Sequence, residues 1–182
     1  MIREIAPDVF VETEYHGANV GFVLSGEGVI LVDSPMLPKQ ARHWLKEIRK
    51  RTGEPVRYII NTDHHRAHIV GNQYFPGANV IAHENAWKEM RSYGDSFRTR
   101  LLNMYRDRMP DAVAEWEESL QIVKPHITFT NRSVMFKGDK EIHLITVGGH
   151  TPATSVVYLP HERLLFAVDV VVTNRSTFLS QG

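Results

Sequence analysis

Three histidines and one aspartate stand within six residues of this sequence. The cluster comes directly after the apolar run 56–60 and comprises Asp63, His64, His65 and His68. Imidazole nitrogens and carboxylate oxygens are ligands that zinc and other borderline divalent metals take in proteins. The chain contains no cysteine, which excludes thiolate ligands from its own side chains. The cluster therefore indicates a hydrolytic type of metal site, and the alternative is a solvated polar loop.

Residues of the same kind follow other predicted strands. His150 lies in a Gly-Gly-His-Thr-Pro turn, whose glycines allow close backbone approach and whose proline ends strand pairing. Asp169 follows the apolar run 164–168, and Asp33 follows the apolar run 29–32. Each is ordinary at a strand end by itself, and Asp33 could equally cap a turn. Their recurrence together with the histidine cluster favours one shared site.

Length and composition predict one domain spanning residues 1–182. The chain is 42% hydrophobic and 23% charged, within the ordinary range for globular proteins. Its formal net charge is zero, which favours a small-molecule substrate over nucleic acid or an anionic membrane. The N-terminus does not resemble a signal peptide, and no apolar run approaches the length of a membrane span. We expect a cytoplasmic location by default.

Hydrophobic periodicity predicts the elements that must position these residues. In the first half, apolar runs predict strands at 8–15, 19–24, 28–32, 56–60 and 78–82. Apolar residues at helical spacing predict a helix from Pro38 that ends before Gly53. In the second half, strands are predicted at 127–129, 133–136, 141–147, 155–159 and 163–168. This order indicates helices packed on a mixed sheet, and so an α/β (α+β) class.

Between these halves, residues 83–121 are predicted to form a helical insertion, because apolar residues recur there every three or four positions. Gly94 and Asp95 could split it into two helices. The segment also contains several arginines with aromatic residues nearby, which permits a nucleic-acid interpretation: Arg91, Arg98, Arg100, Arg106 and Arg108. Interspersed acidic residues favour a solvated helix face instead, so a nucleic-acid partner is not expected.

Taken together, these segments resemble the metallo-β-lactamase-fold hydrolase superfamily. The similarity covers nearly the whole chain, from Asp33 through the loop 61–72 and the turn 148–152 to Asp169. Four such signals in this order are specific to the family. The resemblance implies a metallo-β-lactamase-like αββα sandwich, in which two mixed sheets lie face to face with helices outside.

The family's ligand loop reads His-x-His-x-Asp-His. The match places Asp63 at its first histidine and His65 at its second. Ala67 stands at its aspartate and His68 at its last histidine. The resemblance therefore implies that Asp63, His65 and His150 bind one metal ion, and that His68 is a remnant of a second metal site.

The resemblance also implies roles for residues around these ligands. Asp169 would be the bridging carboxylate of the metal site. Asp33 would lie behind the ligand loop and support it. Thr62 and Thr151, each next to a predicted ligand, are expected to support the site in the same way.

Two departures from the family pattern concern the second metal. Ala67 offers no ligand, which also removes the group that orients the attacking water in many relatives. Family members usually continue to a final histidine ligand, whereas this sequence stops at Gly182. We therefore expect one Zn²⁺, or another divalent metal, per chain, and a fold whose C-terminal part is missing or incomplete.

The leading hypothesis is a metal-dependent hydrolase that cleaves an ester, lactone, thioester or β-lactam type bond. A metal ion would lower the pKa of a bound water toward ~7, so that hydroxide attacks near neutral pH. One alternative is a catalytically impaired metal-binding or interaction domain, favoured by Ala67. Another is a nucleic-acid-processing member of the fold, favoured only by the arginines of 91–108. Uncovered apolar surface is expected to produce a homo-oligomer, or to mark a fragment of a longer chain.

Overall fold

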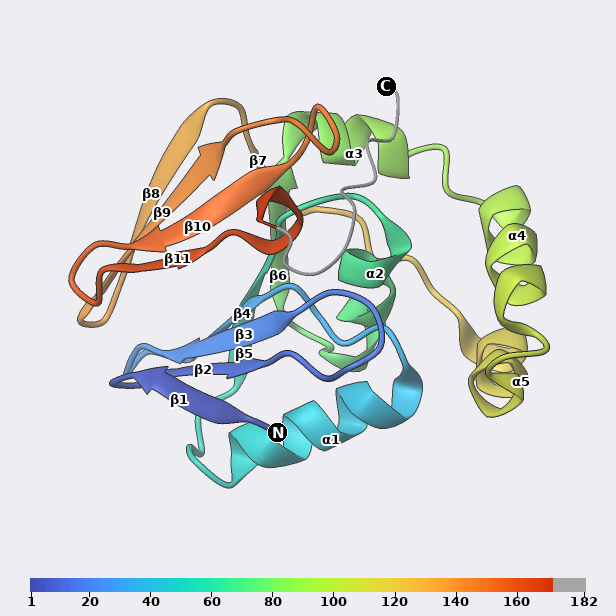
Figure 1. Ribbon diagram of the computed structural model, residues 1–182, viewed down its shortest axis with the longest axis horizontal. Coiled ribbons are helices and arrows are strands. Elements are labelled where there is room, and N and C mark those ends of the chain that lie inside the picture. The colour runs from blue at the N-terminus through green and yellow to red at the C-terminus, as the bar shows by residue number, and fades with distance from the viewer. Residues whose placement is uncertain (172–182) are drawn as a thin grey trace.

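The computed structural model describes residues 1–171, which form two β-sheets that lie face to face (Figure 1). The larger sheet has seven strands in the order β1-β2-β3-β4-β5-β6-β7. The smaller sheet has four strands in the order β11-β10-β9-β8. The predicted α/β class and the arrangement of two opposed sheets are therefore confirmed.

In the larger sheet, sequence order and spatial order coincide. Its strands are β1 (Arg3–Ala6), β2 (Val9–Glu12), β3 (Val20–Leu24), β4 (Val29–Val32), β5 (Val56–Asn61), β6 (Asn79–His83) and β7 (Ile127–Phe129). Strands β1 to β4 are antiparallel neighbours, whereas β4 to β7 are parallel. Parallel neighbours need crossover connections, which here carry the helices. The carboxyl ends of β4 and β5 therefore lie side by side, and the predicted site residues follow both.

The described part of the smaller sheet is antiparallel throughout, so the expectation of two mixed sheets is correct only for the larger sheet. Its strands are β8 (Arg132–Lys137), β9 (Lys140–Thr146), β10 (Ser155–Leu159) and β11 (Leu164–Phe166). The predicted turn between β8 and β9 is tight, and Gly138 adopts a positive φ of 54° there. A Cβ at Gly138 would lie 1.6 Å from the carbonyl oxygen of Ser25, so this turn packs against the hairpin of the larger sheet. Only glycine fits this position.

Apolar side chains from both sheets form the core between them. Ile30 and Ile60 of the larger sheet pack with Leu144 and Phe166 of the smaller one. Full burial of an aliphatic or phenyl side chain contributes about 1.5–3 kcal/mol. The two sheets come into close contact at Gly21 in β3, where a Cβ would lie 2.3 Å from Cε1 of Phe166.

The outer face of the larger sheet is covered by α1 (Pro38–Arg49). Proline suits the first helical turn, because its missing N–H would have no intrahelical acceptor there. Trp44 and Ile48 recur at helical spacing and are buried against Phe22 of β3. The predicted helix is therefore confirmed, together with the apolar stripe that attaches it to the sheet.

The predicted insertion 83–121 is helical and divides into three helices: α3 (Glu84–Met90), α4 (Asp95–Tyr105) and α5 (Pro110–Ser119). Gly94 is the N-cap of α4, which confirms a break at that residue. Trp116 of α5 is buried in a cluster with Met36 and Ile69. Since Ile69 belongs to α2 (Arg66–Ile69), this cluster packs the insertion against the ligand loop.

Several predicted boundaries are corrected by the structure. The strand predicted at 8–15 is limited to Val9–Glu12, and β1, an exposed edge strand, was not predicted. The strand predicted to reach Val168 ends at Phe166. Val168 has a positive φ of 29°, which turns the chain into the short 3-10 helix η2 (Val168–Val170) and carries Asp169 out of the sheet.

The outer face of the smaller sheet presents apolar side chains to solvent. Phe136 is 70% exposed and Leu165 is 52% exposed. Among residues 1–171, no helix is both long and apolar enough to cross a bilayer. Residues 172–182, to which the expectation about the end of the chain refers, lie outside the described residues.

Candidate metal centre

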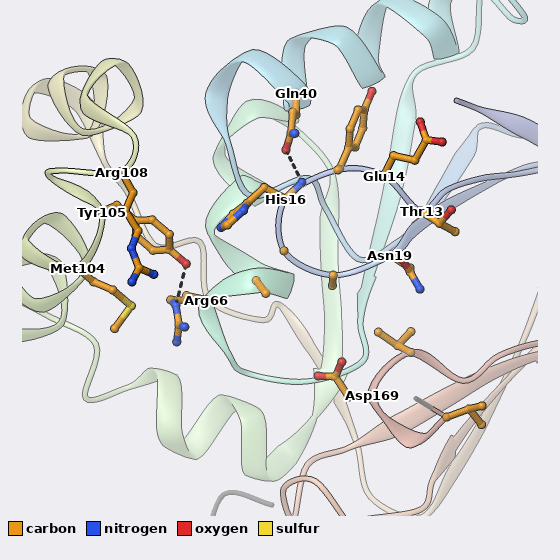
Figure 2. A pocket seen from close by; sticks show the side chains of 16 residues that line it. Thr13, Glu14, His16, Asn19, Gln40, Arg66, Met104, Tyr105, Arg108 and Asp169 are labelled. Carbon is orange, nitrogen blue, oxygen red and sulfur yellow. Dashed lines mark hydrogen bonds between the residues drawn. The ribbon is translucent and has the colours of Figure 1, made fainter. Parts of the chain in front are cut away.

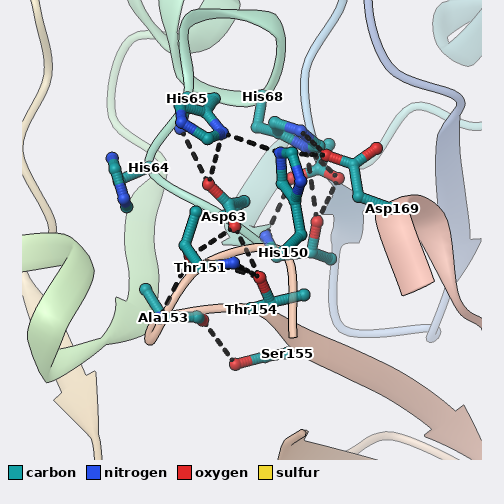
Figure 3. Close-up of polar contacts among 12 residues, drawn as sticks. Asp63, His64, His65, His68, His150, Thr151, Ala153, Thr154, Ser155 and Asp169 are labelled. Carbon is teal, nitrogen blue, oxygen red and sulfur yellow. Dashed lines mark hydrogen bonds and ion pairs between the residues drawn. The ribbon is translucent and has the colours of Figure 1, made fainter. Parts of the chain in front are cut away.

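The structure brings the predicted site residues together from four separate segments (Figure 3). Asp33 follows β4, and Thr62 with Asp63 follows β5. His150 lies in the connection between β9 and β10, and Asp169 lies in η2 after β11. The site therefore forms between the two sheets, at the carboxyl ends of the parallel strands.

Asp63 is a buried carboxylate, only 1% exposed, with both oxygens hydrogen-bonded. Its Oδ2 accepts hydrogen bonds from Thr151 Oγ1 at 2.7 Å and Thr154 Oγ1 at 2.8 Å. Its Oδ1 accepts one from the His65 backbone N–H at 3.1 Å and lies 3.1 Å from His65 Nδ1. Burial by itself would raise the pKa of Asp63, but the His65 hydrogen bond and the charge of His68 outweigh it and hold the pKa far below its usual range. Asp63 is therefore an anion whose orientation is held by two threonines.

His65 and His150 face each other through their ring nitrogens. The distance from His65 Nδ1 to His150 Nε2 is 3.1 Å. In a tetrahedral zinc site with Zn–N bonds of 2.0–2.1 Å, two nitrogen ligands stand about 3.4 Å apart. His65 Nδ1 also lies 3.1 Å from Asp63 Oδ1, so each of these two pairs of atoms is spaced about as two ligands of one ion would be, and their chemistry suits zinc.

His68 is buried between two carboxylates. Its Nδ1 lies 2.9 Å from Asp33 Oδ2, and its Nε2 lies 2.9 Å from Asp169 Oδ2. Burial would lower the pKa of His68, but the charge of Asp33 and the hydrogen bonds to both carboxylates raise it well above its usual value. The imidazolium of His68 in turn lowers the pKa of Asp169 against the effect of burial. Asp169 Oδ2 also lies 3.7 Å from His150 Nε2, so His68 holds this carboxylate beside the candidate metal ligands.

Asp33 lies behind the ligand loop. It is fully buried and has a positive φ of 55°, which is uncommon for a residue other than glycine. Its carboxylate accepts hydrogen bonds from the Thr62 backbone N–H at 2.9 Å and from Thr62 Oγ1 at 2.7 Å. The Thr62 carbonyl accepts a hydrogen bond from the Ser155 N–H at 2.9 Å, which ties the loop to β10 of the other sheet.

A buried polar network also supports the ligand loop, and its residues were given no role from the sequence. Asn61 Nδ2 donates to the His68 carbonyl at 2.9 Å, and Asn72 Nδ2 donates to Asn61 Oδ1 at 2.8 Å. Ser34 Oγ donates to Asn72 Oδ1 at 2.8 Å. Thr154 was missed as well. The only sequence feature that could have identified these residues is their position, since they lie next to predicted ligands or at the end of a predicted strand.

His64 offers a second possible ligand arrangement. Asp63, His64 and His65 each present one ligand atom, and these atoms all lie within 4.8 Å of one another. The Nδ1 of His64, however, lies 2.9 Å from the hydroxyl of Tyr93, which is between α3 and α4. In Figure 3 the His64 ring lies apart from the ring of His150. The three residues form a possible metal-binding group, while the predicted set uses His150 in place of His64.

A pocket of about 1030 Å³ adjoins this centre (Figure 2). It is lined by Thr13, Glu14, Tyr15, His16, Gly17, Ala18, Asn19, Gln40, Arg66, Ala67, Met104, Tyr105, Arg108, Val168, Asp169 and Val171. Ala67 and Asp169 connect the pocket to the candidate centre, since Ala67 belongs to the ligand loop. A ligand in this pocket would therefore lie next to the metal ligands.

Comparison with known proteins identifies the family. A sequence profile described as the metallo-beta-lactamase superfamily matches residues 14–181. A metallo-beta-lactamase type 2 from Elizabethkingia meningoseptica is 24% identical over 172 residues, a match that covers 90% of this chain and 59% of that protein. The chain thus spans 59% of the length of this curated relative.

Solved structures show the same fold. A metallo-beta-lactamase from Pontibacter korlensis superimposes with a TM-score of 0.72 at 20% identity, covering 100% of this chain and 76% of that one. A metallo-beta-lactamase family protein from Thermus thermophilus superimposes with a TM-score of 0.69 at 20% identity, covering 98% of this chain and 64% of that one. These matches confirm the predicted fold, and the profile match shows that the chain belongs to the metallo-beta-lactamase superfamily.

Proposed function

We propose that this protein is a metal-dependent hydrolase that opens an ester, lactone, thioester or β-lactam type bond. The observation that carries the proposal is the position of His65, whose Nδ1 lies 3.1 Å from Asp63 Oδ1 and 3.1 Å from Nε2 of His150, which comes from the other sheet. Membership of the superfamily supports hydrolysis as the general chemistry. The fold does not determine which of these bonds is cleaved, because one fold hosts many reactions.

Zinc is the metal we propose, with Asp63, His65 and His150 as its ligands and Asp169 beside them. When bound, zinc would lower the pKa of water and act as a Lewis acid toward the attacked carbonyl. Two imidazoles and one carboxylate are a ligand set of the catalytic type, which leaves a position open for reaction.

The chain's own residues would hold this geometry. Thr151 and Thr154 orient the carboxylate of Asp63, so that Oδ1 is directed toward His65. The imidazolium of His68 orients Asp169 through Nε2. The side chain of Asp169 is 34% exposed, compared with 1% for Asp63, so Asp169 can reach solvent. It is the carboxylate we propose for orienting a water and accepting its proton.

The experiment is a metal count on single variants. The full chain, purified without chelator, should hold about one zinc per chain by mass spectrometry, and His65→Ala or His150→Ala should lose most of it. His64→Ala is the matched control, since it removes an imidazole from the same loop, and it should retain the metal. Equal loss in His64→Ala would favour the Asp63, His64 and His65 group instead.

A substrate panel then tests hydrolysis itself. Chromogenic esters, a thioester, lactones and a β-lactam should include at least one compound whose hydrolysis requires zinc and is lost in His150→Ala. Ala67 favours one other candidate function, a metal-binding domain without catalysis, because it places a methyl group where the family has a carboxylate. Tight zinc binding with no turnover of any compound would support that function.

A further inference from the structure

The pocket beside the candidate centre is bordered by two guanidinium groups (Figure 2). Arg66 comes from the ligand loop, and Arg108 comes from the segment between α4 and α5. Arg66 is held in place, because its Nε donates a hydrogen bond to the Tyr105 hydroxyl at 3.1 Å and its guanidinium lies over the Tyr105 ring. His16 lines the same pocket, and burial together with the charges of Arg66 and Arg108 lowers its pKa. The positive charge is thus concentrated on one side of the pocket.

Only three arginines of residues 1–171 form an ion pair with a carboxylate. Arg42, Arg51 and Arg106 each form an ion pair with a glutamate. Within residues 1–171, neither Arg66 nor Arg108 forms an ion pair with a carboxylate. The pocket therefore contains guanidinium groups whose charge is not balanced by a carboxylate of the described chain.

The carboxylates that line the same pocket are already compensated. Glu14 contacts the N-terminal ammonium of Met1. Asp169 accepts a hydrogen bond from His68. The remaining polar lining residues, such as Gln40 and Asn19, are neutral. The net field in the pocket should consequently attract an anion.

We propose that this pocket binds a carboxylate or phosphate group of the substrate, with Arg66 and Arg108 as the residues that bind it. Guanidinium groups recognise such oxyanions through paired, charge-assisted hydrogen bonds. The pocket volume of about 1030 Å³ is at the upper end of ordinary small-molecule sites. The inference rests on the proposed function, since the pocket would hold the anionic end of the substrate while the scissile bond lies near Asp169.

Two esters with the same leaving group test this assignment. 4-Nitrophenyl acetate has a neutral acyl group, and mono-4-nitrophenyl succinate carries a carboxylate. Arg66→Gln and Arg108→Gln should each raise KM for the succinate ester roughly tenfold, with little change for the acetate ester. Arg100→Gln is the matched control, because Arg100 is an exposed arginine of α4 that does not line the pocket, and it should change neither ester.

A binding measurement separates this inference from the proposed hydrolysis. Calorimetric titration of the zinc-loaded chain with succinate, and separately with inorganic phosphate, shows which oxyanion the pocket prefers. Arg108→Gln should weaken binding of the preferred anion roughly tenfold at unchanged zinc content, whether or not any ester is hydrolysed. No anion binding, or equal weakening in Arg108→Gln and Arg100→Gln, would overturn the pocket assignment. Intact anion binding without turnover would overturn only the hydrolase proposal.

Discussion

Asp33 illustrates how much of the site depends on one residue that does not face the candidate metal. Its carboxylate accepts hydrogen bonds from Thr62 and contacts the buried imidazole of His68, which in turn holds Asp169. Its left-handed backbone is tolerated by aspartate and asparagine better than by most residues. Position 33 therefore requires a residue that tolerates a left-handed backbone and that carries a negative charge beside His68.

Substitution of Asp33 should separate these two requirements. Asp33→Ala should lower the free energy of unfolding by about 3 kcal/mol or more, because it leaves the His68 imidazolium buried with one partner fewer and strains the backbone. Asp33→Asn keeps the tolerated backbone and the side-chain shape, so its loss should be smaller. Urea unfolding of both variants measures the difference, and equal losses would contradict the role given to the backbone.

The buried ion pairs also predict a pH dependence for the metal-free protein. The pKa of His68 is raised in the folded state, so protonated His68 contributes to the free energy of unfolding. This contribution is fully present below about pH 6.5 and is lost as the pH rises toward the pKa of the folded state. One such proton gives a slope of at most about 1.4 kcal/mol per pH unit. Asp63 and Asp169 have lowered pKa values, so their contribution is lost as pH falls below about 4.

Urea unfolding of chelator-treated protein at a series of pH values between 3 and 9 would measure the loss of stability on the acid side and on the alkaline side. Asp33→Asn removes the nearby charge that raises the pKa of His68, so its stability should fall less steeply above about pH 6.5. The loss of stability at low pH, which is attributed to Asp63 and Asp169, should be unchanged in this variant. An unchanged alkaline slope would show that another group binds the proton.

Ala67 is the residue at which the family alignment can be tested most directly. Ala67→Asp should raise the zinc count above that of the parent chain, because it restores a carboxylate next to His68. Ala67→Asn has nearly the same shape without the charge and should leave the count unchanged. An equal count in both variants would contradict the alignment of this loop.

At the scale of elements, the contact between β3 and β11 couples sheet packing to the site. Phe166 of β11 lies against Gly21 of β3, and Asp169 follows Phe166 closely along the chain. The turn through Val168 begins directly after this contact. A displacement of β11 should therefore also move the carboxylate that His68 holds.

Gly21→Ala should show this coupling. The added methyl group would lie 2.3 Å from the Phe166 ring, and overpacking of a core typically costs about 1–3 kcal/mol. We also expect a lower zinc content, because Asp169 would shift with β11. Gly53→Ala is the control, since Gly53 has open space around it and should change neither quantity. A destabilised Gly21→Ala protein with full zinc content would show that Asp169 is positioned independently of the sheet contact.

At the scale of the whole molecule, the outer face of the smaller sheet is an exposed surface with several large apolar side chains. Strand pairing places Phe136 and Val134 of β8 on the same face as Leu165 of β11, and all three are exposed. His143 and Glu141 of β9 are polar neighbours on this face. Exposed apolar patches on a monomer commonly mark an interface.

Self-association was expected from the sequence and remains a prediction. We expect this exposed face of the smaller sheet to be the interface. Sedimentation across a concentration series should detect a concentration-dependent oligomer that Phe136→Glu weakens at least tenfold, since it places a charge in an apolar interface. Ile5→Glu, which charges an exposed apolar residue on the edge of the larger sheet, should leave association unchanged. A strictly monomeric parent chain would refute the prediction.

Much of the fold follows from local patterns. The periodicity around Trp44 predicted α1, the break at Gly94 was correctly expected, and the strands ending before Asp33 and Asp63 were found close to their predicted ends. These features depend on side-chain spacing and turn residues within a few positions, which a sequence displays directly. β1 was missed because its residues are mostly exposed and lack an apolar pattern.

The residue types at the strand ends, and with them the metal-ligand chemistry and the family, could be inferred from the sequence alone. Which atoms meet depends on the folded arrangement: His150 with His65 across the sheets, Thr154 with Asp63, and His64 with Tyr93. The arginine pocket is likewise assembled from segments far apart in the chain. The reason is physical: spacing along a chain controls local conformation, whereas contacts between distant segments depend on how the two sheets and the helical insertion pack.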